Sequence, residues 1–578
     1  MDANEAARIL DEMGTLLELQ GENPFRCRAY HNAANSLRAL ELDLGDLVAE
    51  GKLGEVPGIG ETLVAKITQL VTTGKLQAYE QLLADTPPGL AALLRVPGLG
   101  PKKIKTLRDD LKISSLADLR IAGETGKLAS LKGFGEKTQA AILEGIAFIE
   151  SVGDRILQSK ARRLVAPIVE AVEARKDVFR VEVCGSLRRR AETIGDLDVL
   201  FSALDPVPVL EAFVHLPQVA KVLVHGPTKA SVRLAGGVQC DLRGVTDEQF
   251  PFALHYFTGS KDHNIAMRRR AIARGLKLNE YSLEGKNGAI ACKTEEDVFK
   301  ALGLEYIPPE LREDRGEIDL AERGELPNLI ETKDLTGTFH CHSEWSDGTN
   351  TLEEMANAAK ELGMKYLGIA DHSRSAGYAG GLSIERVRQQ WLEIDALNKK
   401  MGPSFRVFKG TECDILGDGS LDFPDEILDG FDYVVASVHS LFRLPREEMT
   451  RRIVRAVRHP KVTMLGHPTG RLLLTRDAYA LDLDAVLEAA AESKTMIEIN
   501  ADPHRLDLDA NACRKAKSLG VVIVINPDAH TTDGLLNNDY GIGVARKAGL
   551  EKKDVFNTQS LKEIVNGLER SKNPASKT

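Results

Sequence analysis

The sequence lacks any apolar run long enough to cross a membrane, and it contains few cysteines. A membrane-spanning helix needs about 20 consecutive apolar residues, and no such run occurs among the 578 residues. The first residues are acidic and lack the basic start and apolar centre of a secretory signal. The seven cysteines are scattered without a Cys-x-x-Cys pair, which argues against a disulfide framework or a cysteine-based zinc finger. We expect a cytoplasmic protein with no membrane contact.

Acidic side chains outnumber basic ones overall. The net charge is −10, which argues at first against a nucleic-acid partner. The distribution is uneven, however, because residues 101–300 contain 32 Lys and Arg against 26 Asp and Glu, whereas residues 1–100 and 301–578 are both net negative. A positive middle region is compatible with DNA binding, and an acidic carboxyl-terminal part suits a domain that holds cations. At about 100–200 residues per domain, the length predicts several domains.

Three segments in the first 150 residues repeat one glycine pattern between predicted helices. They are Val56-Pro57-Gly58-Ile59-Gly60, Val96-Pro97-Gly98-Leu99-Gly100 and Lys132-Gly133-Phe134-Gly135. Glycine permits a sharp turn and lets the backbone N–H groups of the following helix approach a phosphate closely. Such a contact carries no base specificity. The alternative interpretation is a set of simple turns in a helical bundle.

These repeats resemble the helix-hairpin-helix motif of DNA repair enzymes. Residues 1–80 are similar to the small lyase domain of DNA polymerase beta, and residues 81–150 to a fingers-type DNA-binding subdomain. In that family a lysine at the position of Lys66 forms a Schiff base with the sugar of an abasic site. The resemblance therefore implies an all-α region that binds DNA, with Lys66 as a possible catalytic amine; a solvated or phosphate-binding lysine is the alternative.

A pair of aspartates follows a turn in the middle of the chain. Period-two alternation places Asp196 and Asp198 on one face of a strand, and a further predicted strand contains Asp241. Three carboxylates on adjacent strands can hold two Mg²⁺ or Mn²⁺ ions about 4 Å apart. One ion would activate a primer 3′-hydroxyl, and the other would neutralise a triphosphate. Taken alone, an Asp-x-Asp pair is more often a solvated strand edge.

The turn before these aspartates contains Gly185 and Ser186, and we expect it to contact triphosphate oxygens together with Arg189. The longer segment Cys-Gly-Ser-Leu-Arg-Arg-Arg-Ala-Glu-Thr-Ile-Gly-Asp-Leu-Asp-Val-Leu resembles the family X DNA polymerases within the nucleotidyltransferase superfamily. The resemblance implies an α+β palm over residues 151–254, with Gly195 also near the nucleotide.

The segment after the palm extends this resemblance. It implies a thumb-type subdomain over residues 255–315 that selects deoxynucleoside triphosphates (dNTPs), because the family's Tyr-Phe-Thr-Gly-Ser bend crowds the sugar. The implied nucleotide contacts are Tyr256, Phe257, Gly259 and Asn264. Arg268 would contact the template strand, or else belong to a solvated basic helix face.

The last part of the chain alternates strand-length apolar runs with helical stretches after a charged linker at 316–334. This alternation predicts an α/β barrel or a layered sheet with its chemistry at the carboxyl ends of the strands. Metal-ligand side chains stand at those ends: His340, His342, Asp347, His372, Glu412, His439, His467, Asp528 and His530. Histidine mixed with carboxylate suits Mn²⁺, Zn²⁺ or Fe²⁺, and nine ligands require two or three ions.

Their order resembles the PHP (polymerase and histidinol phosphatase) domain, which implies a distorted (β/α)7 barrel over residues 335–571. The whole chain is similar to bacterial and archaeal family X polymerases that carry this domain. The resemblance implies gap-filling synthesis in DNA repair and Mn²⁺-dependent 3′–5′ exonuclease or 3′-end processing. The implied partners are gapped or primer-template DNA and dNTPs, and we expect a monomer. The alternatives are a small-molecule phosphatase and a catalytically silent DNA-binding scaffold.

Overall fold

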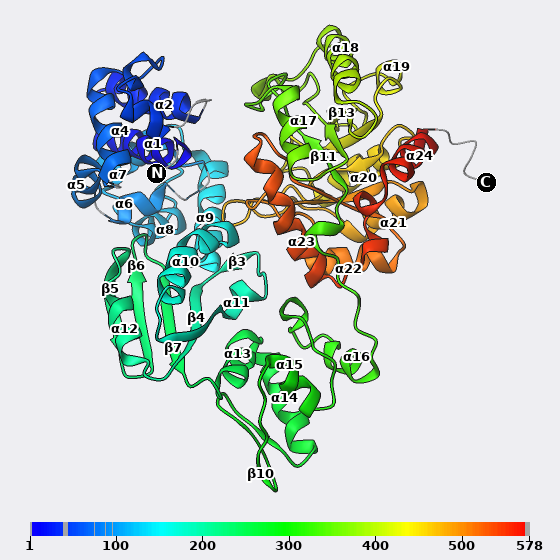
Figure 1. The fold of residues 1–578 in the computed structure, drawn as a ribbon. Helices are drawn as coiled ribbons and strands as arrows, with labels where there is room; N and C mark the ends of the chain where they lie inside the picture. Colours follow the sequence, from blue (N-terminus) through cyan, green and yellow to red (C-terminus); the bar gives the residue numbers. More distant parts are fainter. Residues whose placement is uncertain are drawn as a thin grey trace. The chain divides into compact units, whose positions relative to one another are not determined.

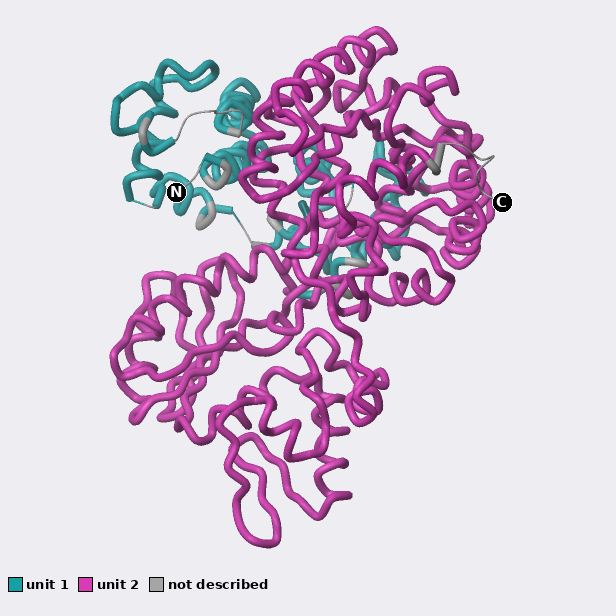
Figure 2. The backbone as a smooth tube through the Cα atoms, turned by 45° about the vertical axis from the view of Figure 1, so that its right-hand side comes forward, with its two compact units in different colours: residues 1–153 teal, residues 154–578 magenta. Residues whose placement is uncertain are grey.

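The computed structural model describes residues 3–38, 44–73, 75–86, 88–94, 96 and 98–572. The chain forms two compact units, residues 1–153 and residues 154–578 (Figure 2). Each unit has its own hydrophobic cores. No helix among the described residues is long and apolar enough to cross a membrane.

The first unit is entirely helical over its described residues (Figure 1). Its core consists of leucine, isoleucine and alanine side chains that recur at helical spacing, such as Leu10, Met13 and Leu17 in the first helix. This is the all-α region that the sequence predicts. Its elements are α1 (Ala3–Gln20), α2 (Pro24–Arg38), α3 (Leu44–Ala49), η1 (Leu53–Glu55), α4 (Glu61–Thr73), α5 (Gln77–Asp85), α6 (Pro88–Leu93), α7 (Pro101–Leu111), α8 (Leu116–Glu124) and α9 (Gly135–Val152).

The second unit begins with a mixed five-stranded sheet of order β2-β4-β7-β6-β5, the palm. Its central strands β4 and β7 run parallel, whereas the other pairs are antiparallel. The helix α10 packs its apolar face beside the sheet through Val165 and Ile168. The elements are β1 (Ile156–Leu157), α10 (Gln158–Glu173), β2 (Val178–Val183), α11 (Gly185–Arg188), β3 (Thr193–Ile194), β4 (Asp196–Ala203), α12 (Val207–Val214), β5 (Val219–His225), β6 (Lys229–Leu234) and β7 (Gln239–Val245).

The thumb follows the palm and is built around a buried ion pair. Arg312 and Glu295 are both almost fully buried and contact each other, and Arg312 lies over the rings of Phe299 and Tyr306. The elements are α13 (Phe250–Thr258), α14 (Lys261–Ala273), β8 (Lys277–Leu278), β9 (Leu283–Gly285), β10 (Gly288–Ala289), α15 (Glu295–Ala301) and η2 (Pro309–Leu311). The segment 316–334, expected as a linker, contains α16 (Glu317–Arg323) and η3 (Thr332–Asp334), and Ala321 belongs to the thumb core.

Seven parallel strands in sequence order, β11 to β17, form the barrel that the resemblance to the PHP domain predicts. A bridge between Cys341 and Ala529 brings the first and last strands together. Helices cover the outside of the strands (Figure 1), so the strands are buried on both faces and are apolar almost throughout. The strands are β11 (Gly337–Cys341), β12 (Tyr366–Ile369), β13 (Arg406–Asp414), β14 (Tyr433–Ser437), β15 (Met464–Leu465), β16 (Met496–Asn500) and β17 (Ile523–Asn526).

The barrel helices connect these strands and return the chain to the opposite end of the barrel. They are α17 (Leu352–Glu361), η4 (Gly377–Ala379), α18 (Ile384–Met401), α19 (Asp425–Leu428), α20 (Arg446–Val457), α21 (Leu483–Ser493), α22 (Ala510–Ser518), η5 (Asp533–Asn537), α23 (Asn538–Lys547), η6 (Lys552–Asp554), η7 (Phe556–Thr558) and α24 (Leu561–Lys572).

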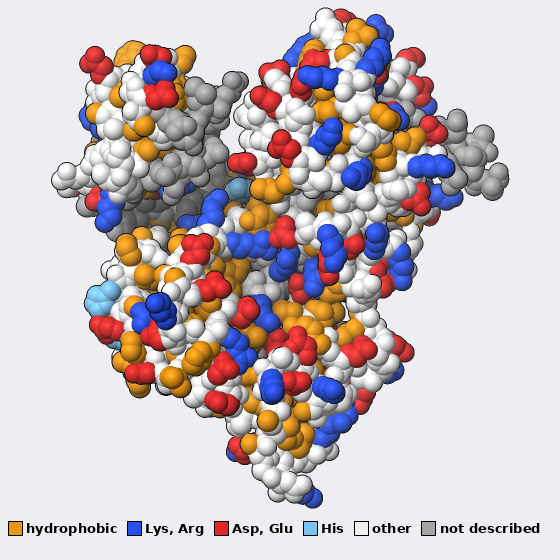
Figure 3. All heavy atoms as spheres, in the orientation of Figure 1, with side chains coloured by type: hydrophobic (Ala, Val, Ile, Leu, Met, Phe, Trp, Pro, Cys, Tyr) orange, Lys and Arg blue, Asp and Glu red, His pale blue; other side chains and the backbone are white. Residues whose placement is uncertain are grey.

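Ion pairs join the palm to the barrel within the second unit. Asp539 of α23 pairs with Arg162 at 2.7 Å and with Arg190 at 3.2 Å. Arg471 of the barrel pairs with Glu192 at 2.9 Å. These ion pairs show that the palm and the barrel meet through charged side chains. On the face of the molecule in Figure 3, acidic and basic side chains are interspersed.

Candidate functional sites

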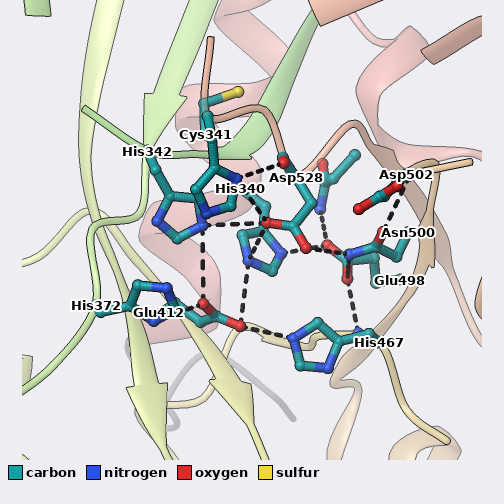
Figure 4. A network of polar contacts seen from close by, with 12 residues as sticks. His340, Cys341, His342, His372, Glu412, His467, Glu498, Asn500, Asp502 and Asp528 are labelled. Carbon is teal, nitrogen blue, oxygen red and sulfur yellow. Dashed lines mark hydrogen bonds and ion pairs between the residues drawn. The ribbon is translucent and has the colours of Figure 1, made fainter. Parts of the chain in front are cut away.

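All nine predicted PHP ligands converge at the carboxyl ends of the barrel strands. Figure 4 shows the imidazoles of His340, His342, His372 and His467 around the Glu412 carboxylate, with Asp528 beside His340 and His342. Four groups of side chains have ligand atoms that all lie within 4.8 Å of one another, among the residues that the structure describes. The groups are His342, Asp347, His372 and His530; His340, His342 and Glu412; His340, His467 and Asp528; and His372, Glu412 and His439.

Glu412 lies at the centre of this cluster and reaches ligands from several strands. Its Oε1 is 2.8 Å from His467 Nε2, 3.2 Å from His439 Nε2 and 3.3 Å from His340 Nε2. Its Oε2 is 3.0 Å from His372 Nδ1. One carboxylate thus lies between imidazoles of four different strand ends, as expected of a group that bridges metal ions.

Two further carboxylates complete the cluster on either side of His342. Asp528 Oδ1 is 3.2 Å from His342 Nε2. Asp347 lies 3.4 Å from His530 Nε2 and 3.5 Å from His372 Nε2. The imidazoles of His342 and His530 stack with ring centroids 4.2 Å apart. Each of the four groups therefore combines histidine nitrogens with carboxylate oxygens. This is the donor set that Mn²⁺, Zn²⁺ and Fe²⁺ accept.

Over the described residues, several buried imidazole nitrogens in this cluster have no hydrogen-bond partner. They are Nε2 of His340, both ring nitrogens of His342, Nδ1 of His372 and Nδ1 of His467. A buried polar atom without a partner costs free energy, and native structures almost always provide one. Metal ions coordinated by these nitrogens would remove that cost, so the residues present fit the ions that the ligand types imply.

The electrostatics of the cluster also favour bound cations. Burial alone would lower the pKa of His372, but Glu412 and Asp347 outweigh it and raise the pKa to about 11. Burial likewise opposes the rise in the pKa of His530 to about 9, which Asp347 and Asp528 cause. The carboxylates thus favour protonation of these imidazoles. Bound divalent ions would supply the positive charge in place of those protons.

The palm places the three predicted aspartates on neighbouring strands. Asp198 of β4 stands opposite Asp241 of β7 in the parallel register, and Asp196 is two residues before Asp198 on the same face. Burial, then the charges of Asp196 and Asp241, raise the pKa of Asp198 to about 7. Asp241 is held by Lys229 Nζ at 2.5 Å and by Gln239 at 2.9 Å. Mutual repulsion of this kind is relieved when a divalent cation binds.

The palm aspartates are not among the groups whose ligand atoms all lie within 4.8 Å. The turn before them nevertheless lies close to Asp198. Gly185 has a φ of +62°, and a Cβ at this position would collide with Oδ2 of Asp198. Only glycine fits this approach, so the Gly185-Ser186 turn is fixed directly beside the carboxylate, while Gly195 immediately precedes β4.

The expected nucleotide contacts make other bonds in the structure. Arg189 pairs with Glu313 at 3.2 Å and donates to the Thr258 carbonyl at 2.8 Å. Asn264 donates to the Tyr256 carbonyl at 2.7 Å, and its Oδ1 would lie only 2.6 Å from a Cβ on Gly259. These groups are gathered around the palm–thumb junction, and their contact with a nucleotide stays a prediction.

The remaining thumb side chains form an aromatic and cationic group. The rings of Tyr256 and Phe257 lie 5.0 Å apart, edge to face. Arg268 lies over the Tyr256 ring at 5.1 Å, and Arg243 of β7 lies over Phe257 at 4.5 Å. Arg268 on α14 is therefore near the sugar-selecting segment that the sequence predicts.

The glycine repeats of the first unit form the expected turns before helices. Gly58, Gly98 and Gly133 have φ values of +87°, +80° and +92°, which glycine adopts at little cost. The helices α4, α7 and α9 begin directly after or at the last glycine of each repeat: Gly60, Gly100 and Gly135. Pro97 of the second repeat lies outside the described residues.

Lys66, the proposed lyase nucleophile, lies in the middle of α4. Its Nζ donates a hydrogen bond to the Tyr30 hydroxyl, and it lies 5.0 Å from the centroid of the Tyr30 ring. The tyrosine therefore orients the amine. Its role in catalysis is untested.

Four family models match this chain. They describe a helix-hairpin-helix domain at residues 1–76, a SAM-like helix-hairpin-helix tandem at 90–147, a DNA polymerase beta thumb at 253–313 and a PHP domain at 338–502. The chain is 38% identical to the DNA polymerase/3′-5′ exonuclease PolX of Bacillus subtilis (strain 168) over 575 residues, 99% of this chain and 100% of that protein. This chain belongs to the PolX family. Its family X polymerase part and its carboxyl-terminal PHP domain were both expected from the sequence.

Two more distant relatives each match only part of the chain. It is 26% identical to DNA polymerase lambda of Rattus norvegicus over 334 residues, 53% of this chain and 55% of that protein. It is 28% identical to a probable phosphatase of Thermoanaerobacter sp. (strain X514) over 239 residues, 38% of this chain and 90% of that protein.

Carboxylates behind the PHP ligands support them, and these carboxylates were not predicted from the sequence. Glu498 accepts a hydrogen bond from His340 Nδ1 at 2.6 Å, and Asp414 accepts one from His439 Nδ1 at 2.5 Å. Such bonds fix the tautomer and the orientation of a metal-ligating histidine. A signal existed for Glu498, because a glutamate between Ile497 and Ile499 in a buried strand is costly unless it has a partner.

Proposed function

We propose that this PolX chain fills gaps during DNA repair and also removes nucleotides from DNA 3′ ends in its PHP domain. The observation that carries the proposal is the complete set of nine converging PHP ligands on the same chain as the aspartates of β4 and β7. A scaffold without catalytic activity would not need either the nine PHP ligands or the palm aspartates to converge. We further propose Mg²⁺ or Mn²⁺ for the palm and two or three Mn²⁺, Zn²⁺ or Fe²⁺ ions for the barrel.

In the polymerase step, the primer 3′-oxygen attacks the α-phosphorus of a dNTP. The bond from that phosphorus to the oxygen bridging the β-phosphate breaks, pyrophosphate leaves, and the hydroxyl proton passes to solvent. A pair of divalent ions held by Asp196, Asp198 and Asp241 would lower the pKa of the hydroxyl and neutralise the pyrophosphate. Catalysis here is mainly positioning, so the Gly185-Ser186 turn and Arg189 hold the triphosphate in line with the primer.

In the nuclease step, water attacks the phosphorus of the last phosphodiester. The bond to the 3′-oxygen of the preceding nucleotide breaks, that oxygen takes up a proton, and a nucleoside 5′-monophosphate leaves. Ions held by the nine ligands would lower the pKa of the attacking water and stabilise charge on the phosphoryl oxygens. Glu412 sets the spacing of the ligands, because its two oxygens lie between imidazoles of four strand ends.

The test uses a labelled gapped duplex incubated with Mn²⁺, with and without dNTPs, so that extension and shortening are read on one gel. We expect Asp198→Ala to abolish extension while shortening continues, and His342→Ala to show the reverse. Primer extension that survives Asp198→Ala refutes the palm assignment. Shortening that survives both His342→Ala and Glu412→Ala refutes the PHP assignment.

A second candidate function for the barrel is hydrolysis of small phosphomonoesters. The likeness of part of the chain to a protein named a probable phosphatase favours it. Turnover of DNA 3′ ends and of a small phosphomonoester by the same Mn²⁺-loaded protein separates the two candidates. We expect the DNA end to be the better substrate, and the opposite ranking would replace the nuclease proposal.

A lyase activity of Lys66 is the third part of the proposal. The hydrogen bond to Tyr30 supports it by orienting the amine. Borohydride trapping on abasic DNA should give a covalent adduct with the wild-type protein and none with Lys66→Ala. The absence of an adduct with the wild-type protein would end this idea. A monomeric state and a cytoplasmic location stay predictions, checked by light scattering and by cell fractionation.

A further inference from the structure

One arginine beside the PHP ligands has N–H donors that make no hydrogen bond within the protein over the described residues. The Arg505 side chain is 19% exposed, and its Nε lies 3.6 Å from Oδ2 of the ligand Asp528. Over the described residues, its guanidinium makes this one ion pair within 4.0 Å and no hydrogen bond. A guanidinium carries five N–H donors, and largely buried donors are normally satisfied. The donors of Arg505 are therefore available to an anion next to the metal ligands.

The neighbouring arginines are already engaged. Arg374 pairs with Asp422 at 3.1 Å. Arg471 pairs with Glu192 at 2.9 Å, and Arg476 donates to the Gly470 carbonyl at 2.8 Å. Arg505 differs from all three because its strongest electrostatic partner is itself a predicted metal ligand.

An exposed aromatic ring stands beside other ligands of the same cluster. Tyr378 is 74% exposed, and its ring centroid lies 6.3 Å from that of His372 and 6.4 Å from that of His439. Its short helix η4 is held at its end, because Arg386 donates a hydrogen bond to the Gly380 carbonyl at 2.9 Å. A large ring kept in water at a fixed position offers a free face for another planar group.

The cluster is open on the side that a polymer end could reach. The Asp347 and His530 side chains are 33% and 37% exposed, whereas His439 is 9% exposed and Glu412 is 1% exposed. Tyr378 lies beside the ligands His372 and His439, and Arg505 lies beside the ligand Asp528. Ring and guanidinium therefore both border the same ligand cluster.

We propose that Tyr378 and Arg505 together clamp the terminal nucleotide of a DNA 3′ end, with the ring stacking on the base and the guanidinium binding the phosphate. Arginine suits this role because its planar fork matches phosphate oxygens. Stacking on tyrosine is tolerant of sequence, since every base has an aromatic face. The clamp rests on the proposed nuclease and explains how the barrel selects a nucleotide over a small phosphomonoester, which has no base for Tyr378.

The test compares two oligonucleotides that differ only at the 3′ end, one with a normal terminal nucleotide and one with an abasic residue. The full-length protein is loaded with Mn²⁺, and removal of the terminal residue is measured for each. We expect kcat/KM to favour the base-bearing end about 5- to 150-fold, the range that stacking on one base supplies. Tyr378→Ala should bring this ratio close to one, and Tyr378→Phe should keep it. Leu392→Ala, a control at a residue that is 71% exposed on α18, should also keep it.

Arg505→Met tests the phosphate contact. We expect it to lower kcat/KM for both ends about tenfold or more through a higher KM, with bound manganese unchanged by elemental analysis. Arg446→Met, on the exposed side of α20, is the matched control. A ratio in Tyr378→Ala equal to that of the wild type overturns the clamp, as does an Arg505→Met protein that has lost its metal or kept its KM. A wild-type protein that removes neither residue overturns the nuclease as well, so the two failures are distinguishable.

Discussion

Glu498→Gln replaces one carboxylate oxygen of Glu498 with an amide nitrogen. The effect can be worked out from the four groups that surround the side chain. Oε1 accepts from His340 Nδ1 at 2.6 Å and from Asn526 Nδ2 at 2.8 Å. Oε2 accepts from the His467 backbone N–H at 2.7 Å and from Asn500 Nδ2 at 3.2 Å. All four partners donate, so a carboxylate satisfies them and an amide cannot.

In the variant, the amide nitrogen must face two donors whichever way the side chain turns. If it faces His340, the proton on Nδ1 loses its acceptor, and the tautomer that leaves Nε2 free for a metal ion is no longer favoured. Loss of a partner of this kind typically weakens metal binding about 10- to 100-fold, or about 1.4–2.7 kcal/mol. We therefore expect Glu498→Gln to bind Mn²⁺ that much more weakly at the His340 side of the cluster.

The assay is competition for bound manganese against a chelator of known affinity, read by elemental analysis, with thermal unfolding as a check that the barrel stays folded. Glu447→Gln, an exposed position at the start of α20, is the matched control. If a folded Glu498→Gln protein held manganese within twofold of the wild type, the inference that this carboxylate fixes His340 would be wrong.

Three further predictions concern the palm and thumb. Gly185→Ala should abolish primer extension and cost about 1–2 kcal/mol of stability from its left-handed φ, measured by extension and by urea unfolding; near-normal extension would contradict the close approach to Asp198. Because burial and then Asp196 raise the pKa of Asp198 to about 7, protons should compete with Mg²⁺ below that pH. The Mg²⁺ concentration for half-maximal extension should then rise about tenfold between pH 8 and pH 6, and a flat profile would contradict the shift. Arg312→Met leaves Glu295 buried and partly unpaired, so we expect a loss of about 3–5 kcal/mol in unfolding free energy, seen as a lower urea midpoint; an unchanged midpoint would contradict the role of this pair.

Much of both sites was predictable because short sequence patterns fix local geometry. Period-two alternation placed Asp196 and Asp198 on one strand face, and the register of β4 with β7 sets Asp198 against Asp241. Strand-length apolar runs that each end in His, Asp or Glu predicted the barrel ligands. Carboxyl ends of parallel strands share one edge of a sheet, so the ligands converge wherever those strands pair in order. The number of strands came from the resemblance and not from the alternation itself.

Other features depend on partners far along the chain, which no local pattern reveals. Arg189 was expected at a triphosphate, yet its carboxylate partner Glu313 is 124 residues away. The charged segment 316–334 was expected as a linker, but α16 buries Ala321 in the thumb core, because a helix needs only one apolar stripe to pack. Burial of Glu498 could be suspected from its strand, whereas its pairing with His340 is visible only in three dimensions.

The order of the barrel strands carries a consequence for how the enzyme is made. Ligands come from both edges of the sheet, the earliest being His340 within β11 and the latest His530 after β17. A growing polypeptide has its palm aspartates complete some 290 residues before His530 is synthesised. The polymerase half can therefore fold and bind ions first, while the nuclease centre waits for nearly the whole chain. A chain whose translation stopped between these two points would have the polymerase aspartates but an incomplete nuclease site.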